Sequence, residues 1–390
     1  MREDAPIYRG KPRVALVLSG GGARSAYQVG VLKAIAGWCA AGAPLPFAIL
    51  CGTSAGAINA AVLAAHGGDM QRGAAALVRV WGGFRTGQVF RVDSLDMLRS
   101  GLHLLLALLS GGWLLPAPRA LFNNAPLREL LAQQVDFAAV RRALDRGMPD
   151  ALAITATCIT RGESVTFVDA SCGFMPWDRA GRRGSAVAIG VEQLMASSAI
   201  PLLFPAVAMG DAHFGDGAMR LAAPLAPAIH LGAERILVIG VRKQGPTPAS
   251  DGHAPNMADQ FGFMLDTLFM EGLQADLERL VRINTLLGGL PRGPAPLGMR
   301  HVEALLVEPH RDPSEIALPH RMAMPGTLRA LLRILGATRA RGGRLLSYLL
   351  FESPYTRELI RLGESDANAR RGEISAFLGL DCGPAAAGRH

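Results

Sequence analysis

The chain has 390 residues, half of them hydrophobic, which is enough for one large domain or two modest domains with a buried core. Its formal charge of +8 favours a phosphate-bearing partner, either nucleic acid or an anionic membrane, unless it only reflects a solvated basic surface. No basic stretch interleaves with aromatic residues as a base-stacking surface requires, so we expect a membrane rather than nucleic acid.

In chain order, the first predicted element is a buried strand over Val14–Leu18 that closes on a glycine-rich turn. A helix over Ala26–Trp38, a buried strand over residues 47–51 and a helix over Ala55–Ala65 follow. The later elements are two strands over Ala151–Cys158 and residues 164–168, helices over residues 191–198 and 225–231, and a strand over residues 235–241. Strands that alternate with helices predict an α/β fold whose mostly parallel sheet is covered on both faces.

A boundary is predicted at residues 244–256, which are rich in Pro, Gly, Ser and Thr. Beyond it, the pattern predicts a long helix over residues 257–287, a strand over residues 302–308 and further helices. We therefore expect three parts: a tail (1–13), a main α/β domain (14–243), and a mainly helical C-terminal region (244–390) packed on that domain.

The segment Gly52-Thr53-Ser54-Ala55-Gly56 matches the pattern G-x-S-x-G. A predicted strand precedes it and a predicted helix follows, which is the arrangement that holds a nucleophilic serine on a sharp turn. The flanking glycines suit such a turn because a Cβ would clash where the chain folds back. Ser54 is therefore a candidate nucleophile, and the alternative is an ordinary N-cap serine.

A glycine-rich loop follows the first strand and opens a helix. It does not match a dinucleotide fingerprint, because Ser25 stands where the third glycine belongs, and it lacks the Gly-Lys of a P-loop. Main-chain amides at a helix N-terminus suit an oxyanion. The candidate donors are Gly20, Gly21, Gly22 and Ala23. Arg24 has three interpretations: it fixes the loop, it holds a substrate phosphate, or it is a solvated charge.

The candidate base is Asp216, which has a glycine on each side that leaves its carboxylate uncrowded. The alternative is a plain Asp-Gly turn. None of the nine histidines stands in a motif. A Ser-His-Asp triad that uses His230 or His253 remains a competing hypothesis, as does a non-catalytic lipid-binding or scaffold protein.

Four segments in this order, GGGARSAYQVGVL, GTSAGAINA, ASSAIPLLFPAV and DGA, resemble the patatin-like phospholipase family. The resemblance covers residues 14–241, and the segments at 124–127 and 155–157 also resemble family landmarks. It implies a three-layer α/β/α catalytic domain and a lipid acyl hydrolase that needs no metal or other cofactor. It also implies a Ser54–Asp216 dyad without histidine, with the oxyanion loop at residues 20–23. The family usually has glycine at the position of Ser25.

Two segments are candidates for peripheral contact with a membrane. Residues 101–115 are Leu-rich but fall short of the ~20 residues that span a bilayer, so a lid or a buried helix is equally consistent. Residues 328–351 combine leucines with five arginines, as basic interfacial helices do, and a helix packed on the main domain is the alternative. The pair Gly342-Gly343 is predicted to break this helix in two.

The five cysteines form no CxxC pair, which argues against a disulfide framework and a structural zinc site. The N-terminus has no apolar run of the signal-peptide type. These features predict a cytoplasmic protein that contacts the inner membrane surface peripherally.

Overall fold

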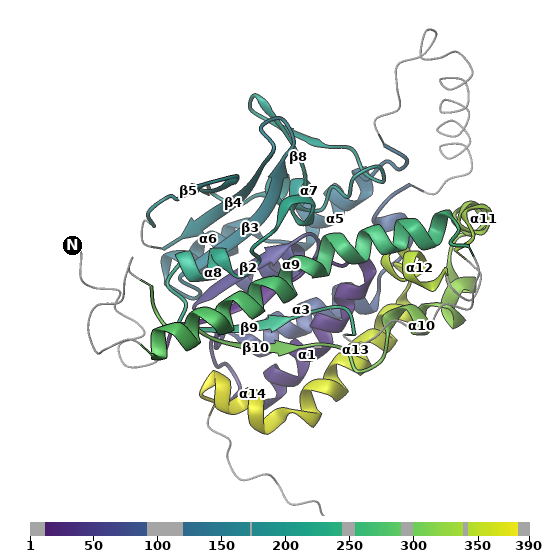
Figure 1. Cartoon of the computed structure of the whole chain (residues 1–390). Coiled ribbons are helices and arrows are strands. Elements are labelled where there is room, and N and C mark those ends of the chain that lie inside the picture. The colour runs from purple at the N-terminus through teal and green to yellow at the C-terminus, as the bar shows by residue number, and fades with distance from the viewer. Residues whose placement is uncertain are drawn as a thin grey trace, which may run out of the picture.

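The computed structural model describes residues 12–91, 120–171, 174–243, 254–289, 299–337 and 342–380. Its strands are β1 (Val14–Leu18), β2 (Ile49–Thr53), β3 (Ala151–Cys158), β4 (Glu163–Ala170), β5 (Asp178–Arg179), β6 (Arg182–Ala186), β7 (Val207–Met209), β8 (Ala212–Asp216), β9 (Arg235–Ile239) and β10 (Glu303–Val307). They form one sheet in the order β10-β9-β1-β2-β3-β4-β6-β5, and β8 pairs with both β3 and β7 (Figure 1). From β10 to β3 all neighbours are parallel, whereas β4 and β8 run antiparallel to β3.

Helices cover both faces of this sheet, which is why β1, β2 and β3 are buried along their whole length. From β1 through β2 to β3, each new strand is added on one side of the sheet. From β8 through β9 to β10, the chain crosses the sheet in the opposite direction. Right-handed crossovers between parallel strands therefore place α1 (Ala26–Trp38) and α2 (Ala55–Ala65) on one face and α9 (Met257–Gly288) on the other. The short helix α8 (Ala226–His230), between β8 and β9, contacts β1 and β2. The result is a three-layer α/β/α fold, in which α9 crosses in front of the sheet in Figure 1.

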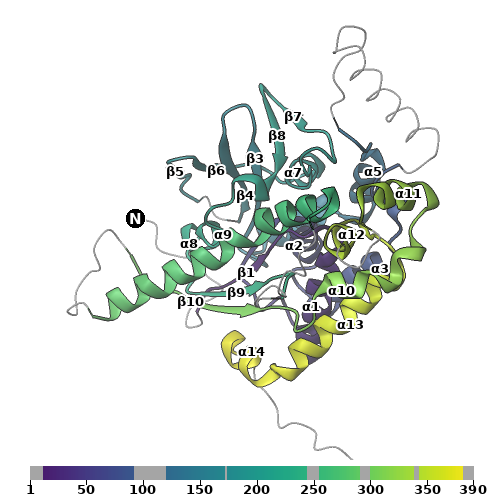
Figure 2. The same ribbon diagram turned by 45° about the vertical axis from the view of Figure 1, so that its right-hand side comes forward.

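The C-terminal region is built into the same fold. Its strand β10 extends the sheet beside β9, and α13 (Ser353–Ala369) packs along α1. Two glycines allow this close approach, because a Cβ on Gly30 would lie 2.0 Å from the Ile360 carbonyl oxygen and one on Gly363 would lie 2.1 Å from that of Tyr27. The other α-helices within the described residues are α3 (Met70–Gly82), α5 (Ala125–Gln134), α6 (Phe137–Asp145), α7 (Val191–Ser197), α10 (Pro313–Ala317), α11 (Gly326–Leu335), α12 (Gly343–Leu349) and α14 (Arg371–Leu378). Figure 2 shows α13 beside α1 and α12 beside α9.

Several predicted bounds match the structure and one strand is displaced. The bounds predicted for β1, α1, α2 and β3 are those observed. The strand predicted at residues 47–51 instead runs from Ile49 to Thr53, because Gly52 pairs with Leu18 of β1 and Thr53 pairs with Thr155 of β3. Main-chain pairing, rather than the apolar run of side chains, sets the ends of this strand.

The segment 328–351 is divided into two helices, as the Gly342-Gly343 pair predicts, and the first of them, α11, is shorter than expected. Helix α11 ends at Leu335, where Gly336 adopts a left-handed conformation with φ of +92°, and α12 begins only at Gly343. Every residue of α12 except Arg344 is buried, so this half is core and not a membrane-facing helix. The Leu-rich segment 101–115 and residues 338–341 lie outside the described residues. No helix in the described ranges is long and apolar enough to cross a membrane.

Candidate active site

The register of the sheet brings Ser54 and Asp216 together. Strand β2 pairs with β3 up to Thr53, which lies opposite Thr155. Strand β8 pairs with the next position of β3, where Asp216 lies opposite Ala156. The other side of β3 is occupied by β4 throughout, so β8 continues along β3 at the point where β2 ends. The residue after β2 and the last residue of β8 therefore meet end to end.

Ser54 sits on a strained turn between β2 and α2. Its backbone has φ of 54° and ψ of −129°, a left-handed conformation that non-glycine residues rarely adopt. The turn is held by Ser197, whose Oγ accepts a hydrogen bond from the Ser54 amide at 2.9 Å and donates one to the Thr155 carbonyl at 2.7 Å. A Cβ on Gly56 would lie 2.3 Å from the Leu18 carbonyl oxygen, so glycine is needed for α2 to approach β1.

Asp216 is held by its backbone, which leaves part of its carboxylate free. The Thr157 hydroxyl donates to the Asp216 carbonyl at 2.9 Å, and the Asp216 amide donates to the Ala199 carbonyl at 2.8 Å. The side chain is buried, and its Oδ1 accepts a hydrogen bond from the Ala218 amide at 2.9 Å. Its Oδ2 is also buried but makes no hydrogen bond with any described residue.

The protonation of Asp216 is set mainly by this burial. Removal from water raises the pKa of the carboxyl from 3.8 to about 7, while the nearby Ser54 hydroxyl and the Ala218 amide oppose the rise. The Ser54 hydroxyl is thus close enough to lower the pKa of Asp216, although Oδ2 lacks a hydrogen bond of standard geometry. A carboxyl with a pKa near 7 can exchange a proton at neutral pH.

The glycine-rich loop lies directly beside this pair. A Cβ on Gly20 would be 3.1 Å from the Cβ of Ser54 and 2.5 Å from the ring of Phe269 on α9. Gly22 has φ of +53°, and a Cβ there would be 2.4 Å from the Tyr348 carbonyl oxygen on α12. The loop backbone therefore passes between the serine turn and two C-terminal helices, and only glycine fits these positions.

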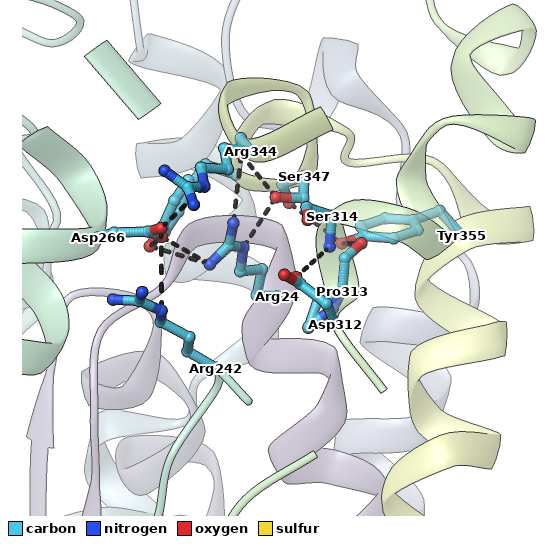
Figure 3. Close-up of polar contacts among 10 residues, drawn as sticks. Arg24, Arg242, Asp266, Asp312, Pro313, Ser314, Arg344, Ser347 and Tyr355 are labelled. Carbon is cyan, nitrogen blue, oxygen red and sulfur yellow. Dashed lines mark hydrogen bonds and ion pairs between the residues drawn. The ribbon is translucent and has the colours of Figure 1, made fainter. Parts of the chain in front are cut away.

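The side chain of Arg24 extends into the C-terminal helices, where it contacts Asp266, Ser347 and the Arg344 carbonyl (Figure 3). Only 1% of it is exposed, so the interpretation as a solvated charge is wrong. Its guanidinium donates to Asp266 Oδ1 at 2.9 Å and to Ser347 Oγ at 2.8 Å, and it lies 3.9 Å from the centre of the Tyr348 ring. Burial lowers the pKa of Arg24, whereas the nearby Tyr348 and Asp266 raise it. The pKa-raising interactions together outweigh burial, so the pKa of Arg24 lies above its ordinary value. This geometry is that of a residue that fixes the loop.

Ser54 is one of the residues that line an apolar pocket. Its walls include Gly22 of the glycine loop and Ala55 of α2, and equal numbers of aromatic and aliphatic side chains form most of the remainder. These are Trp81, Phe84, Phe204 and Phe351, with Ile58, Val89, Leu127 and Ile200 between them. These walls are apolar like a hydrocarbon chain, but the cavity of about 30 Å³ is too small to hold a fatty acyl chain without movement of its walls.

The described histidines do not bond to the serine or the carboxylate. His230 instead stacks on Trp177, with ring centres 4.6 Å apart, and burial together with the positive charge of Arg179 lowers its pKa. His253 lies outside the described residues. No group of three or more metal-ligating side chains occurs in the described parts of the chain.

Three residues that support the site were not singled out from the sequence. Thr157 and Ser197 lie in segments that resemble the family. The resemblance could have drawn attention to both residues, but it did not reveal their hydrogen bonds to the site. Asp266 lies inside a long helical pattern and carries no local signal. Its importance depends on its contact with Arg24, 242 positions earlier.

A serine on a strand–turn–helix elbow beside a buried carboxyl, in a three-layer α/β/α fold, is typical of the serine hydrolase class. The patatin-like phospholipase family model matches residues 16–229, more than half of the chain, so the chain belongs to this family. Membership supports a lipid-hydrolysing esterase as the general class of enzyme. None of the curated proteins matches the sequence significantly.

Solved structures give distant matches. The chain is 13% identical to human GIVD cytosolic phospholipase A2 in complex with methyl gamma-linolenyl fluorophosphonate, with a TM-score of 0.42, and the match covers 94% of this chain and 59% of that one. VipD from Legionella pneumophila is 12% identical with a TM-score of 0.32, and that match covers 90% of this chain and 67% of that one. The chain thus spans about three fifths of the length of the human phospholipase chain.

Proposed function

We propose that this chain is a serine lipid acyl hydrolase that cleaves carboxylic ester bonds of membrane lipids through a Ser54–Asp216 dyad. The observation that carries the proposal is the end-to-end meeting of β2 and β8, which places the serine turn against the buried carboxyl. The glycine loop beside Ser54 supplies the third part that acyl transfer requires, a set of main-chain amides for the oxyanion.

In the first step, Ser54 Oγ attacks the ester carbonyl carbon and its proton passes to Asp216. Oδ2 of Asp216 is the natural acceptor because Oδ1 is already occupied by the Ala218 amide. A new C–O bond forms, the carbonyl π electrons move onto oxygen, and the amides of Gly20, Gly21, Gly22 and Ala23 stabilise the resulting oxyanion. One such donor typically contributes about 3–4 kcal/mol to the transition state.

In the second step, the tetrahedral intermediate collapses and the alcohol leaves with the proton returned from Asp216. The acyl group remains on Ser54 Oγ, beside the apolar pocket. Water then attacks the acyl carbonyl carbon while Asp216 accepts its proton. The second tetrahedral intermediate collapses, the bond to Ser54 Oγ breaks, and Oγ takes the proton back from Asp216 as the fatty acid is released. A dyad suffices because the two side chains are shielded from solvent, which strengthens the interaction between them. Ser54 is 2% exposed and Asp216 is 1% exposed.

Hydrolysis of a short-chain nitrophenyl ester tests this proposal. We expect Ser54→Ala to abolish turnover, and retention of more than a trace would contradict the nucleophile assignment. His230→Ala is the control, because a triad requires that histidine whereas the dyad predicts that activity survives. An inactive wild-type chain would instead favour the lipid-binding or scaffold hypothesis. Lipid profiles of cells that carry the wild type or Ser54→Ala would then identify the natural ester.

The proposal includes peripheral contact with a membrane surface. On α11, Leu328 and Leu332 pack inward while Arg333 and Ile334 face outward, with Ile334 83% exposed. Exposed apolar and cationic side chains on one helix suit the headgroup region of an anionic bilayer. Sedimentation with phospholipid vesicles, with and without anionic lipid, tests this contact. Absence of binding in both cases would contradict it.

A further inference from the structure

The main-chain amides of Ser54 and Asp216 both donate to one short segment at the end of α7. The Ser54 amide donates to Ser197 Oγ at 2.9 Å, and the Asp216 amide donates to the Ala199 carbonyl at 2.8 Å. Helix α7 ends at Ser197 and packs against both β3 and β8. Residues 197–199 therefore contact the serine turn after β2 and the end of β8 at the same time, although these two lie far apart in the chain.

The hydroxyl of Ser197 continues the hydrogen bonding of the sheet where β2 stops. Strand β2 pairs with β3 up to Thr53, which lies opposite Thr155. At Ser54 the chain turns into α2, and the Ser197 hydroxyl lies between the two backbones. It accepts from the Ser54 amide and donates to the Thr155 carbonyl at 2.7 Å. Because Ser197 is fully buried, both main-chain groups depend on this hydroxyl rather than on solvent.

This contact acts on a residue whose backbone is strained. Ser54 has φ of 54° and ψ of −129°, and such a conformation persists in a non-glycine residue only where the surroundings enforce it. Its carbonyl accepts the Ala57 amide at 2.9 Å, which is a bond within its own turn and helix. Its amide is held from another element, by Ser197. Without that hydroxyl the buried amide would lose its acceptor, and rotation of the peptide plane would move Ser54 Oγ relative to Asp216.

We propose that Ser197 is a positioning residue that holds the Ser54 hydroxyl in place for attack on the ester. The inference rests on the proposed function, because Ser197 has this task only if Ser54 is the nucleophile. Attack depends on alignment of the reacting atoms, and a displacement of about 1 Å can cost about a hundredfold in rate. Ser197 does not line the apolar pocket, so its effect falls on kcat rather than on substrate binding. The same hydrogen bond occupies the Ser54 amide, which leaves the oxyanion to the glycine loop.

Two readouts of Ser197→Ala test this role. The first is the separation of kcat from KM for a short-chain nitrophenyl ester. The second is the rate constant for modification of Ser54 by diisopropyl fluorophosphate, in which an O–P bond forms and fluoride leaves, so that it reports the serine without the ester. We expect kcat and this rate constant to fall together by about 10–100-fold, with KM changed by less than about twofold. Ser197→Thr keeps the hydroxyl and should recover most of the loss. Thermal unfolding gives the folded fraction to which all rates are referred.

The matched control is Ser375→Ala, which removes the hydroxyl of an equally buried serine on α14. That hydroxyl makes no hydrogen bond within the described residues, so both rates should stay unchanged. Wild-type rates in Ser197→Ala would overturn the inference. A loss confined to KM would do the same, and so would a Ser197→Thr protein no more active than Ser197→Ala. Failure of the proposed function is a separate result, because the wild type itself would then not be modified at Ser54.

Discussion

Two buried aspartates of this protein, Asp216 and Asp266, face opposite electrostatic surroundings. Asp216 lies between the serine turn and β3 with one oxygen unpaired, and no cation forms an ion pair with it in the described structure. Asp266 lies on α9 among three arginines and the Tyr348 hydroxyl. Both are almost inaccessible to water, at 1% and 3% exposure.

The difference shows that burial alone does not decide what a carboxylate does. Without a counter-charge, burial destabilises the ionised form and brings the pKa of Asp216 into the range of a general base. With counter-charges, the carboxylate of Asp266 connects the glycine loop to α9 and α12 through Arg24. We therefore expect changes at Asp216 to affect catalysis, and changes at Asp266 to affect the stability of the folded chain.

The largest expected effect is that of Asp216→Asn on turnover. Asparagine keeps the shape of the side chain but cannot accept the serine proton, so kcat/KM for a nitrophenyl ester should fall about 10²–10⁴-fold. Asp276→Asn is a matched control, because Asp276 is also buried and its pKa is also raised by burial, but it bonds to Leu225 instead of the site. Equal losses in the two variants would contradict a specific role for Asp216.

A large loss of stability is expected for Asp266→Ala. Removal of this carboxylate leaves the Arg24 guanidinium buried without its ion-pair partner, and loss of one member of a buried pair costs about 3–5 kcal/mol. The free energy of unfolding, measured by denaturant titration, checks this. Arg242→Gln serves as the comparison, because its partly exposed contact at 3.9 Å should contribute no more than about 1 kcal/mol. Similar losses in the two variants would contradict the distinction between the buried ion pair of Arg24 and the partly exposed contact of Arg242.

The pH dependence of kcat/KM should follow the titration of Asp216. The base must be ionised to accept a proton, and its pKa is about 7, so activity should be low in acid and reach a plateau above that pH. Below the pKa, each pH unit should lower kcat/KM about tenfold. A profile that is flat between pH 5 and 8 would indicate that a different group accepts the serine proton.

The smallest expected effect is on thermal stability. Because burial raises the folded-state pKa of Asp216 above its unfolded value of 3.8, protonation favours the folded state, and this stabilisation is lost as the pH rises through about 7. An asparagine side chain at this position cannot ionise and avoids the loss. The melting temperature of Asp216→Asn should therefore exceed that of the wild type by more at pH 8 than at pH 5. An equal difference at both pH values would contradict burial of the ionised carboxylate.

Much of the sheet and its nearest helices follows from the sequence by itself. The run Val14–Leu18, the glycine loop and the helices after each turn are encoded by residues that are neighbours in the chain, so periodicity and turn chemistry reveal them. The serine elbow is local in the same way. The family resemblance also paired Ser54 with Asp216, although nothing between the two residues indicates how they meet.

The tertiary structure decided which distant groups touch. The register of β2 and β8 along β3 places the serine turn against Asp216 and leaves Oδ2 unpaired. Arg24 looked equally suited to solvent, loop or substrate, because its partner Asp266 is 242 positions away and no local pattern links them. The leucines of α12 belong to a Leu- and Arg-rich segment that resembled a surface helix, yet they are core because α9 and the glycine loop cover them. Burial and charge pairing arise only when remote segments pack together, and these two conditions determine the chemistry of each aspartate.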